Sequence, residues 1–239
     1  MVTFFGRRRK RVEVPKLRSR SDIPAHVHRV ALGELTPELL PYLGQAAYLQ
    51  LTAFEALSRA VMSAPTAESK EALSRVAALS LARHHGLVDE IERRGESAGT
   101  VMAAYAERID HYRSITQGND WYELLVSCHL TSGILDDFFL RLSEGLQHDA
   151  ATRIADVFAI GSGSDILVEQ LQSAIDANPR LASRLAMWGR RLVGDTLLIA
   201  RSSLAPHPDT AKDEERLEPV FTEVIAAHTR RMDELGLTA

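Results

Sequence analysis

The chain has 239 residues, of which 45% are hydrophobic and 25% are charged, a composition typical of globular proteins. No run approaches the roughly 18 apolar residues that span a membrane, and the few residues before Arg7 are too short for the apolar core of a signal peptide, so we expect a cytoplasmic protein without a transmembrane segment. The single cysteine, Cys128, excludes an intramolecular disulfide and a paired-cysteine zinc motif, and its apolar surroundings indicate a packed thiol.

The charge is unevenly distributed between a short basic tail and an acidic body. Residues 1–20 hold eight basic residues and one acidic residue, a net charge of +7, whereas residues 21–239 hold 20 basic and 31 acidic residues, a net charge of −11. A tail this polar favours disorder, because it has little apolar surface to bury. It could also bind RNA or an anionic surface, although the acidic body argues against a broad RNA-binding face.

Helical periodicity dominates from residue 36 onward, after an extended lead-in over residues 21–35. Thr36 and Pro37 predict the start of a first long helix that runs to residue 64. A second helix follows between Thr66 and Gly95, and its buried stripe is predicted at Leu73, Ala77, Ser80, His84, Leu87 and Ile91.

A short helix near residues 100–114 leads to a third long helix, for which Asp120 and Glu123 form a plausible capping box. A fourth helix is expected from Asp149 to Asn178, weakened or kinked by the Gly and Ser residues at 161–164. Two more helices are predicted at about 181–203 and 213–235.

Four long helices joined by short connections predict an all-α, antiparallel four-helix bundle of ferritin-like type with two additional C-terminal helices. We assign residues 21–239 to this helical domain and residues 1–20 to the basic tail. No alternating strand pattern is present, so we predict no sheet.

A di-iron centre in such a bundle needs one Glu from each of two helices and a Glu-x-x-His pair from each of the other two. The first helix supplies Glu55 within the apolar run LTAFEALSRA, and the second supplies His84, but Leu81 stands three residues before that histidine. The middle of the fourth helix holds no His and no acid before Asp165. The ligand set is therefore incomplete.

Five segments carry a resemblance that covers most of the chain after the tail, namely LTAFEALSRA, ARHHGLVDEI, SGILDDFF, NPRLASRLAMWGRRLVGD and AAHTRRMDELGL. They resemble a family of actinobacterial ferritin-like proteins that is similar to the tRNA isopentenyladenosine hydroxylases, which are di-iron monooxygenases. The resemblance implies the bundle fold, and it implies iron as the cofactor wherever the ligands are kept.

The resemblance also implies which positions would carry those ligands. Glu55 and His84 keep the ligand types of the family pattern. Four other positions are vacated, at Leu81, Ser132, Ile160 and Gly163. Leu81, Ser132 and Ile160 are expected to be buried at the centre of the bundle.

The residual groups leave two interpretations open. Glu55, His84 and Asp136, one turn beyond Ser132, could form a three-ligand mononuclear site. Alternatively, His84 is a core histidine with satisfied ring nitrogens and Glu55 is half exposed or paired with an arginine. The second interpretation is favoured for both residues.

Three functional hypotheses follow. The leading one is a binding or structural protein that lacks a complete di-iron site and needs no cofactor. The main alternative is an iron-dependent hydroxylase acting on modified tRNA, with ligands recruited from Asp136, Asp137, Asp165 or His85. The third is an RNA or membrane-surface adaptor that acts through its basic tail. The substrate, the partner and whether the chain forms a homo-oligomer are not determined by the sequence.

Overall fold

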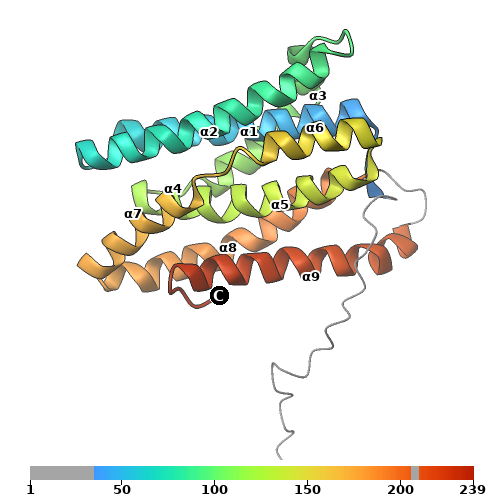
Figure 1. Ribbon diagram of the computed structural model, residues 1–239. Helices are drawn as coiled ribbons and strands as arrows, with labels where there is room; N and C mark the ends of the chain where they lie inside the picture. Colours follow the sequence, from blue (N-terminus) through green and yellow to red (C-terminus); the bar gives the residue numbers. More distant parts are fainter. Residues whose placement is uncertain (1–34, 206–209) are drawn as a thin grey trace, which may run out of the picture. The chain divides into compact units, whose positions relative to one another are not determined.

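The computed structural model describes residues 35–205 and 210–239, and all regular structure in these two ranges is helical (Figure 1). The long helices are α1 (Leu39–Ser63), α2 (Ala67–Glu92), α3 (Ala98–Thr116), α8 (Arg180–Ser202) and α9 (Thr210–Glu234). Shorter segments are α4 (Trp121–Ser127), η3 (Cys128–Ser132), α5 (Gly133–Leu142), η4 (Ser143–Gly145), α6 (His148–Phe158) and α7 (Ser164–Ala177). The all-α prediction is confirmed.

The first half of the bundle is the hairpin of α1 and α2, which lie side by side over most of their length. The hydroxyl of Thr66 accepts a hydrogen bond from the backbone N–H of Ser69 at 3.1 Å and caps α2. The whole predicted stripe of α2 is buried, because a period of three and four residues keeps one face against the core. The predicted start of α1 was wrong by a few residues, since the helix begins at Leu39 with Glu38 as N-cap.

The third helix of the bundle is a continuous run of α4, η3 and α5. Asp120 caps it by accepting from the N–H of Glu123 at 2.9 Å, as the capping box predicts, whereas the Glu123 carboxylate accepts from Asn119 instead of from the cap residue. The η3 segment is a π-helical turn, a feature that often marks functional sites. Cys128 lies there and is buried, which raises the pKa of its thiol although Arg113 lowers it.

The fourth helix is split into α6 and α7 by residues 159–163. Gly161 and Gly163 both adopt positive φ angles, of 89° and 67°, a conformation that glycine reaches without steric cost. The predicted weakness at this point is therefore a complete break in the helix.

The other helices pack outside these four. α3 lies against α1, and α8 and α9 cover the side formed by the third helix (Figure 1). Trp188 fixes α8 by donating its indole N–H to the hydroxyl of Ser127 at 2.9 Å. Both C-terminal helices were predicted from the sequence.

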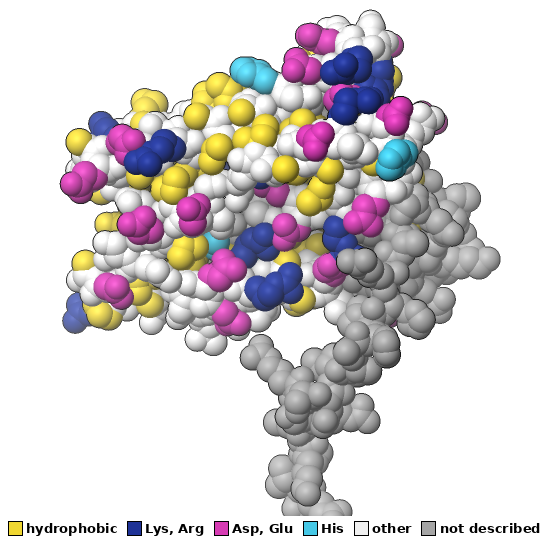
Figure 2. All heavy atoms as spheres, viewed as in Figure 1, with side chains coloured by type: hydrophobic (Ala, Val, Ile, Leu, Met, Phe, Trp, Pro, Cys, Tyr) yellow, Lys and Arg dark blue, Asp and Glu magenta, His cyan; other side chains and the backbone are white. Residues whose placement is uncertain are grey.

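The described part of the chain contains no helix that is long and apolar enough to cross a membrane. On the face drawn in Figure 2, acidic and basic side chains lie intermixed among apolar atoms. The basic tail and nearly all of the lead-in lie outside the described residues, so their roles stay predictions.

Candidate functional site

The polar centre of the bundle begins with Ser80 and Arg83 on α2. Both are buried, and their three-residue spacing places them on one face of the helix. This is the spacing that a Glu-x-x-His metal-binding pair uses. The pair at this spacing that lines the centre is thus Ser80 and Arg83, one residue earlier than Leu81 and His84, the positions that the resemblance implies.

Arg83 makes a buried ion pair with Asp136 of α5. Its Nη1 donates to Asp136 Oδ2 at 2.5 Å, and its Nη2 donates to the backbone carbonyl of Phe158 at 3.0 Å. The two charged side chains are only 6% and 11% exposed, and the guanidinium lies 5.6 Å from the centre of the Phe158 ring. A charge this deeply buried is stable only when a partner of opposite sign is present.

Gln50 of α1 completes the network by donating from Nε2 to Asp136 Oδ1 at 2.6 Å. Three helices of the bundle therefore meet at one carboxylate. Burial raises the pKa of Asp136, while the Arg83 charge and the Gln50 hydrogen bond lower it. Both carboxylate oxygens are already engaged by protein donors.

A small cavity lies beside this network, with about 20 Å³ of free volume, room for about one or two water molecules. Its polar lining comes from four segments of the chain: Gln50, Ser80, Arg83, His129, Ser132, Asp136, Ser162 and Ser164. A second cavity of about 30 Å³ shares Gln50, Ser132 and Asp136 and extends toward Tyr112 and Arg113.

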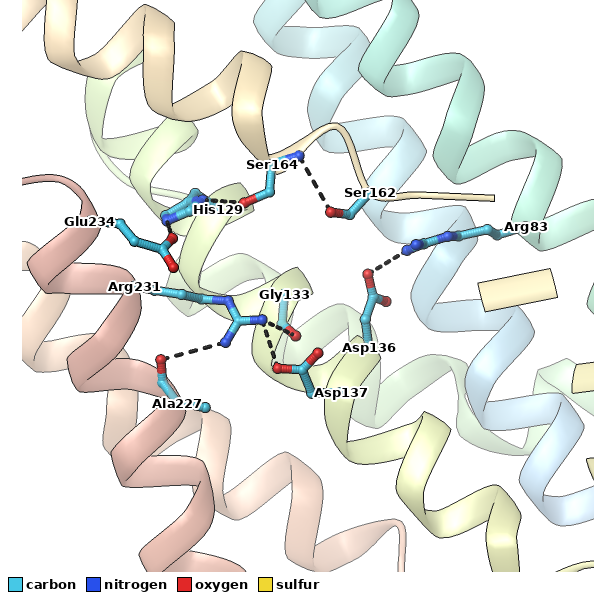
Figure 3. A network of polar contacts seen from close by, with 10 residues as sticks. All are labelled: Arg83, His129, Gly133, Asp136, Asp137, Ser162, Ser164, Ala227, Arg231 and Glu234. Atoms are coloured by element: carbon cyan, nitrogen blue, oxygen red, sulfur yellow. Dashed lines mark hydrogen bonds and ion pairs between the residues drawn. The ribbon is translucent and has the colours of Figure 1, made fainter. Parts of the chain in front are cut away.

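His129, in the π-helical turn, joins this centre to the C-terminal helix (Figure 3). Its Nδ1 lies 3.0 Å from the hydroxyl of Ser164, and its Nε2 lies 3.6 Å from a carboxylate oxygen of Glu234. The side chain is fully buried, and burial lowers the pKa of His129 to about 4. The imidazole is therefore neutral near pH 7.

The structure does not bring the three residual metal candidates together. Glu55 is exposed on α1. His84 is buried, but its Nδ1 lies 2.9 Å from the backbone carbonyl of Ala47, which matches a core histidine with a satisfied ring nitrogen. Only Asp136 lies at the centre, and no group of three or more His, Cys, Asp or Glu in the described ranges could hold a metal ion.

The positions predicted to be vacated also differ from expectation. Ile160 is 41% exposed in the break between α6 and α7, and Leu81 is only half-buried, so neither fills the centre. Ser132 is half-buried and does line both cavities. Gly163 is the N-cap of α7, and a Cβ there would lie 3.0 Å from a methyl of Val76, so a histidine ligand would not fit without movement.

Sequence reasoning missed Gln50 and Arg83 as partners of Asp136, and Ser80 as a residue that lines the cavity beside them. Ser80 was placed on the buried stripe, and Gln50 interrupts the apolar run AAYLQLTAF, so a polar residue in an apolar period was the available signal. Arg83 carried no such mark, because it neighbours His84 and an arginine is usually exposed.

These residues do not fit a di-iron centre. In the described ranges the centre offers one carboxylate, Asp136, where such a site uses about four, and that carboxylate is paired with the permanently charged guanidinium of Arg83. A cation placed beside Arg83 would be repelled by it at low dielectric.

Comparison with known families places the fold. The family described as "Ferritin-like domain, actinomycetes" matches residues 37–210, which include all four helices of the bundle and all of α8. No curated protein matches the chain.

Proposed function

This chain belongs to the actinomycete ferritin-like domain family, and we propose that it is a binding or structural protein in which an ion pair takes the place of the metal centre. The pair is Arg83 with Asp136, supported by Gln50. In this proposal the network holds three helices together, as bridging carboxylates and iron do in a metal-containing bundle.

The single observation that carries the proposal is the buried guanidinium of Arg83. An arginine stays protonated at any physiological pH, so its charge cannot be removed to make room for a cation. Its Nη1 also donates to an oxygen of Asp136, the only carboxylate that lines the central cavity in the described part of the chain. The Asp136 carboxylate therefore already accepts hydrogen bonds from protein donors and is not free to bind iron.

The relation to tRNA hydroxylases is part of this proposal and concerns descent only. The chain would have kept the bundle of such an enzyme while the inward positions changed to Gln50, Ser80 and Arg83. Fold and function separate readily in this way, because a fold is held by its core and an activity by a few side chains. No cofactor is required.

Metal content per chain tests the proposal directly. The full chain, expressed with added iron and purified without chelators, should contain iron well below one atom per chain and should consume no oxygen when supplied with a reductant. About two irons per chain would overturn the proposal and favour the iron-dependent hydroxylase.

A second experiment tests the corrected positions. The triple variant Q50E/S80E/R83H places carboxylates and a histidine where the inward-facing side chains now stand, next to Asp136. Iron should raise the thermal midpoint of this variant and leave that of the parent unchanged, because a ligand stabilises only the state that binds it. The matched control is Q50E/L81E/H84Q, which changes the neighbouring positions of α2 and should show no iron-dependent shift.

A further inference from the structure

A cleft lies away from the polar centre, where the end of α1 meets the start of α4. This cleft has a volume of about 500 Å³, within the roughly 300–1,000 Å³ of small-molecule sites, whereas the central cavities hold about 20–30 Å³. Its lining comes from two helices and the loop between α3 and α4: Arg59, Met62, Ser63, Gln117, Gly118, Asn119, Asp120, Trp121 and Leu124.

Trp121 gives the cleft a rigid aromatic wall. Its indole N–H donates to the backbone carbonyl of Ala60 at 2.9 Å, and its ring packs edge-to-face on Tyr122 with the ring centroids 5.1 Å apart. Met62, another lining residue, is 79% exposed, the highest value among the large exposed hydrophobic side chains described. A fixed ring and an adaptable thioether together offer apolar surface that a flat ligand could cover.

The loop of the cleft is held in place before any ligand arrives. The Glu123 carboxylate accepts from the backbone N–H and the side-chain amide of Asn119, at 2.8 and 2.9 Å. Gly118 has a φ of 80°, and a Cβ there would lie 2.6 Å from Glu123, so only glycine fits this turn. Such preorganisation lowers the entropy cost of binding.

The cleft lining carries one cation, Arg59, and one acid, Asp120, and in the described ranges only the acid has a side-chain partner of opposite charge. Arg59 lies at the cleft and donates from Nη1 to the amide oxygen of Gln117 at 2.8 Å, and in the described ranges no carboxylate forms an ion pair with it. Arg113 is close enough that the Arg59 charge, after burial, lowers the pKa of its guanidinium. The nearby acids Asp120 and Glu123 are both within ion-pair distance of Arg184.

We propose that this cleft binds a small aromatic anion, with the planar ring against Trp121 and Met62 and the carboxylate or sulfonate held by Arg59. Aromatic, arginine and methionine side chains are the types enriched where binding energy concentrates. The cleft shares no residue with the Arg83 network. A test of this site therefore does not depend on whether the proposed function is correct.

A matched pair of fluorescent probes tests the site with the full chain. The anionic probe is 8-anilinonaphthalene-1-sulfonate, and the neutral probe is N-phenyl-1-naphthylamine, which has the same rings without the sulfonate. We expect one anionic probe per chain, quenching of Trp121 emission on binding, and about tenfold weaker binding after Arg59→Gln, because a charge-assisted hydrogen bond is lost. Binding of the neutral probe should be unchanged by Arg59→Gln.

Two controls make the result decisive. Arg201→Gln removes an exposed arginine from α8 and should leave both probes unaffected. Met62→Ser should weaken both probes, because it removes apolar surface next to the ring without adding a charge. Probe binding without saturation, or an Arg59→Gln variant that binds the anionic probe like the parent, would overturn the proposal, and so would equal weakening of the two probes by that change.

Discussion

Two neighbouring aspartates on α5, Asp136 and Asp137, have identical side chains in different environments. Asp136 points into the bundle and is 11% exposed, and it pairs with Arg83 of α2. Asp137, rotated by about 100° on the helix, is 54% exposed and pairs with Arg231 of α9 at 2.7 Å (Figure 3). Each aspartate has one arginine partner, yet only the first pair is removed from water on both sides.

This difference in exposure determines how much each ion pair contributes to the free energy of unfolding. At low dielectric a lone charge is costly, so the partners in the buried pair depend strongly on each other. In water the attraction is screened, and Arg231 also has the carbonyl of Gly133 as an alternative acceptor at 2.9 Å. We therefore expect the Arg83 pair to determine stability and the Arg231 pair to have little influence on it.

Breaking the buried pair should give the largest effect. Arg83→Met leaves Asp136 buried with only Gln50 as a partner, which should cost about 3–5 kcal/mol of the free energy of unfolding. Urea denaturation followed by circular dichroism measures this loss.

The double variant R83M/D136L is its control. It removes both charges and should recover most of the lost stability, since apolar replacements of a buried pair are often neutral. A single variant that loses less than about 1 kcal/mol would show that water reaches the centre and screens Asp136.

His129, the buried histidine next to this centre, should have a smaller effect on the free energy of unfolding, and that effect should depend on pH. Its pKa is about 4 in the folded chain against an ordinary value of 6.5, so between these two values the unfolded chain binds a proton that the folded chain does not. The stabilising contribution of neutral His129 is complete above pH 6.5 and is lost as pH falls toward 4, by roughly 3 kcal/mol in total.

Urea denaturation of the parent and of His129→Gln at several pH values measures this contribution of His129 to the free energy of unfolding. The variant should keep a hydrogen bond to Ser164 and lose less stability than the parent between pH 6.5 and 4. Burial and the charge of Arg231 disfavour the protonated form, whereas a hydrogen bond with the Arg231 backbone favours it. The Glu234 carboxylate lies 3.6 Å from His129 Nε2 and is the acid that could hold the charged form. Parallel pH profiles for the two proteins would mean that Glu234 turns toward His129 and accepts the charge.

The helices and their buried faces could be predicted from the sequence, because apolar periodicity is a local property that each helix carries alone. The stripe on α2 and the cap at Asp120 illustrate this. The break at Gly161 and Gly163 was visible as a weakness, but its completeness depends on the positive φ angles that the loop adopts.

The site could not be predicted in the same way, because one residue of register decides which side chains face inward. Glu55 lies five residues after Gln50 and so points about 140° away from it on an ideal helix, toward solvent. The π-helical turn at Cys128–Ser132 adds a further shift that no periodic pattern encodes. Arg83 was overlooked since only its partner Asp136, on another helix, makes its burial possible.

The smallest effect is expected at the exposed aspartate, and it completes the contrast on α5. Asp137→Asn should change the free energy of unfolding by about 0–1 kcal/mol, because the carboxylate is half in water and Arg231 keeps its bonds to Gly133 and Ala227. The change should shrink further between low and high salt, measured by urea denaturation at both ionic strengths. A loss above about 2 kcal/mol that salt does not reduce would place the α5–α9 contact among the desolvated pairs. The difference between Asp136 and Asp137 would then lie in their partners rather than in their exposure to water.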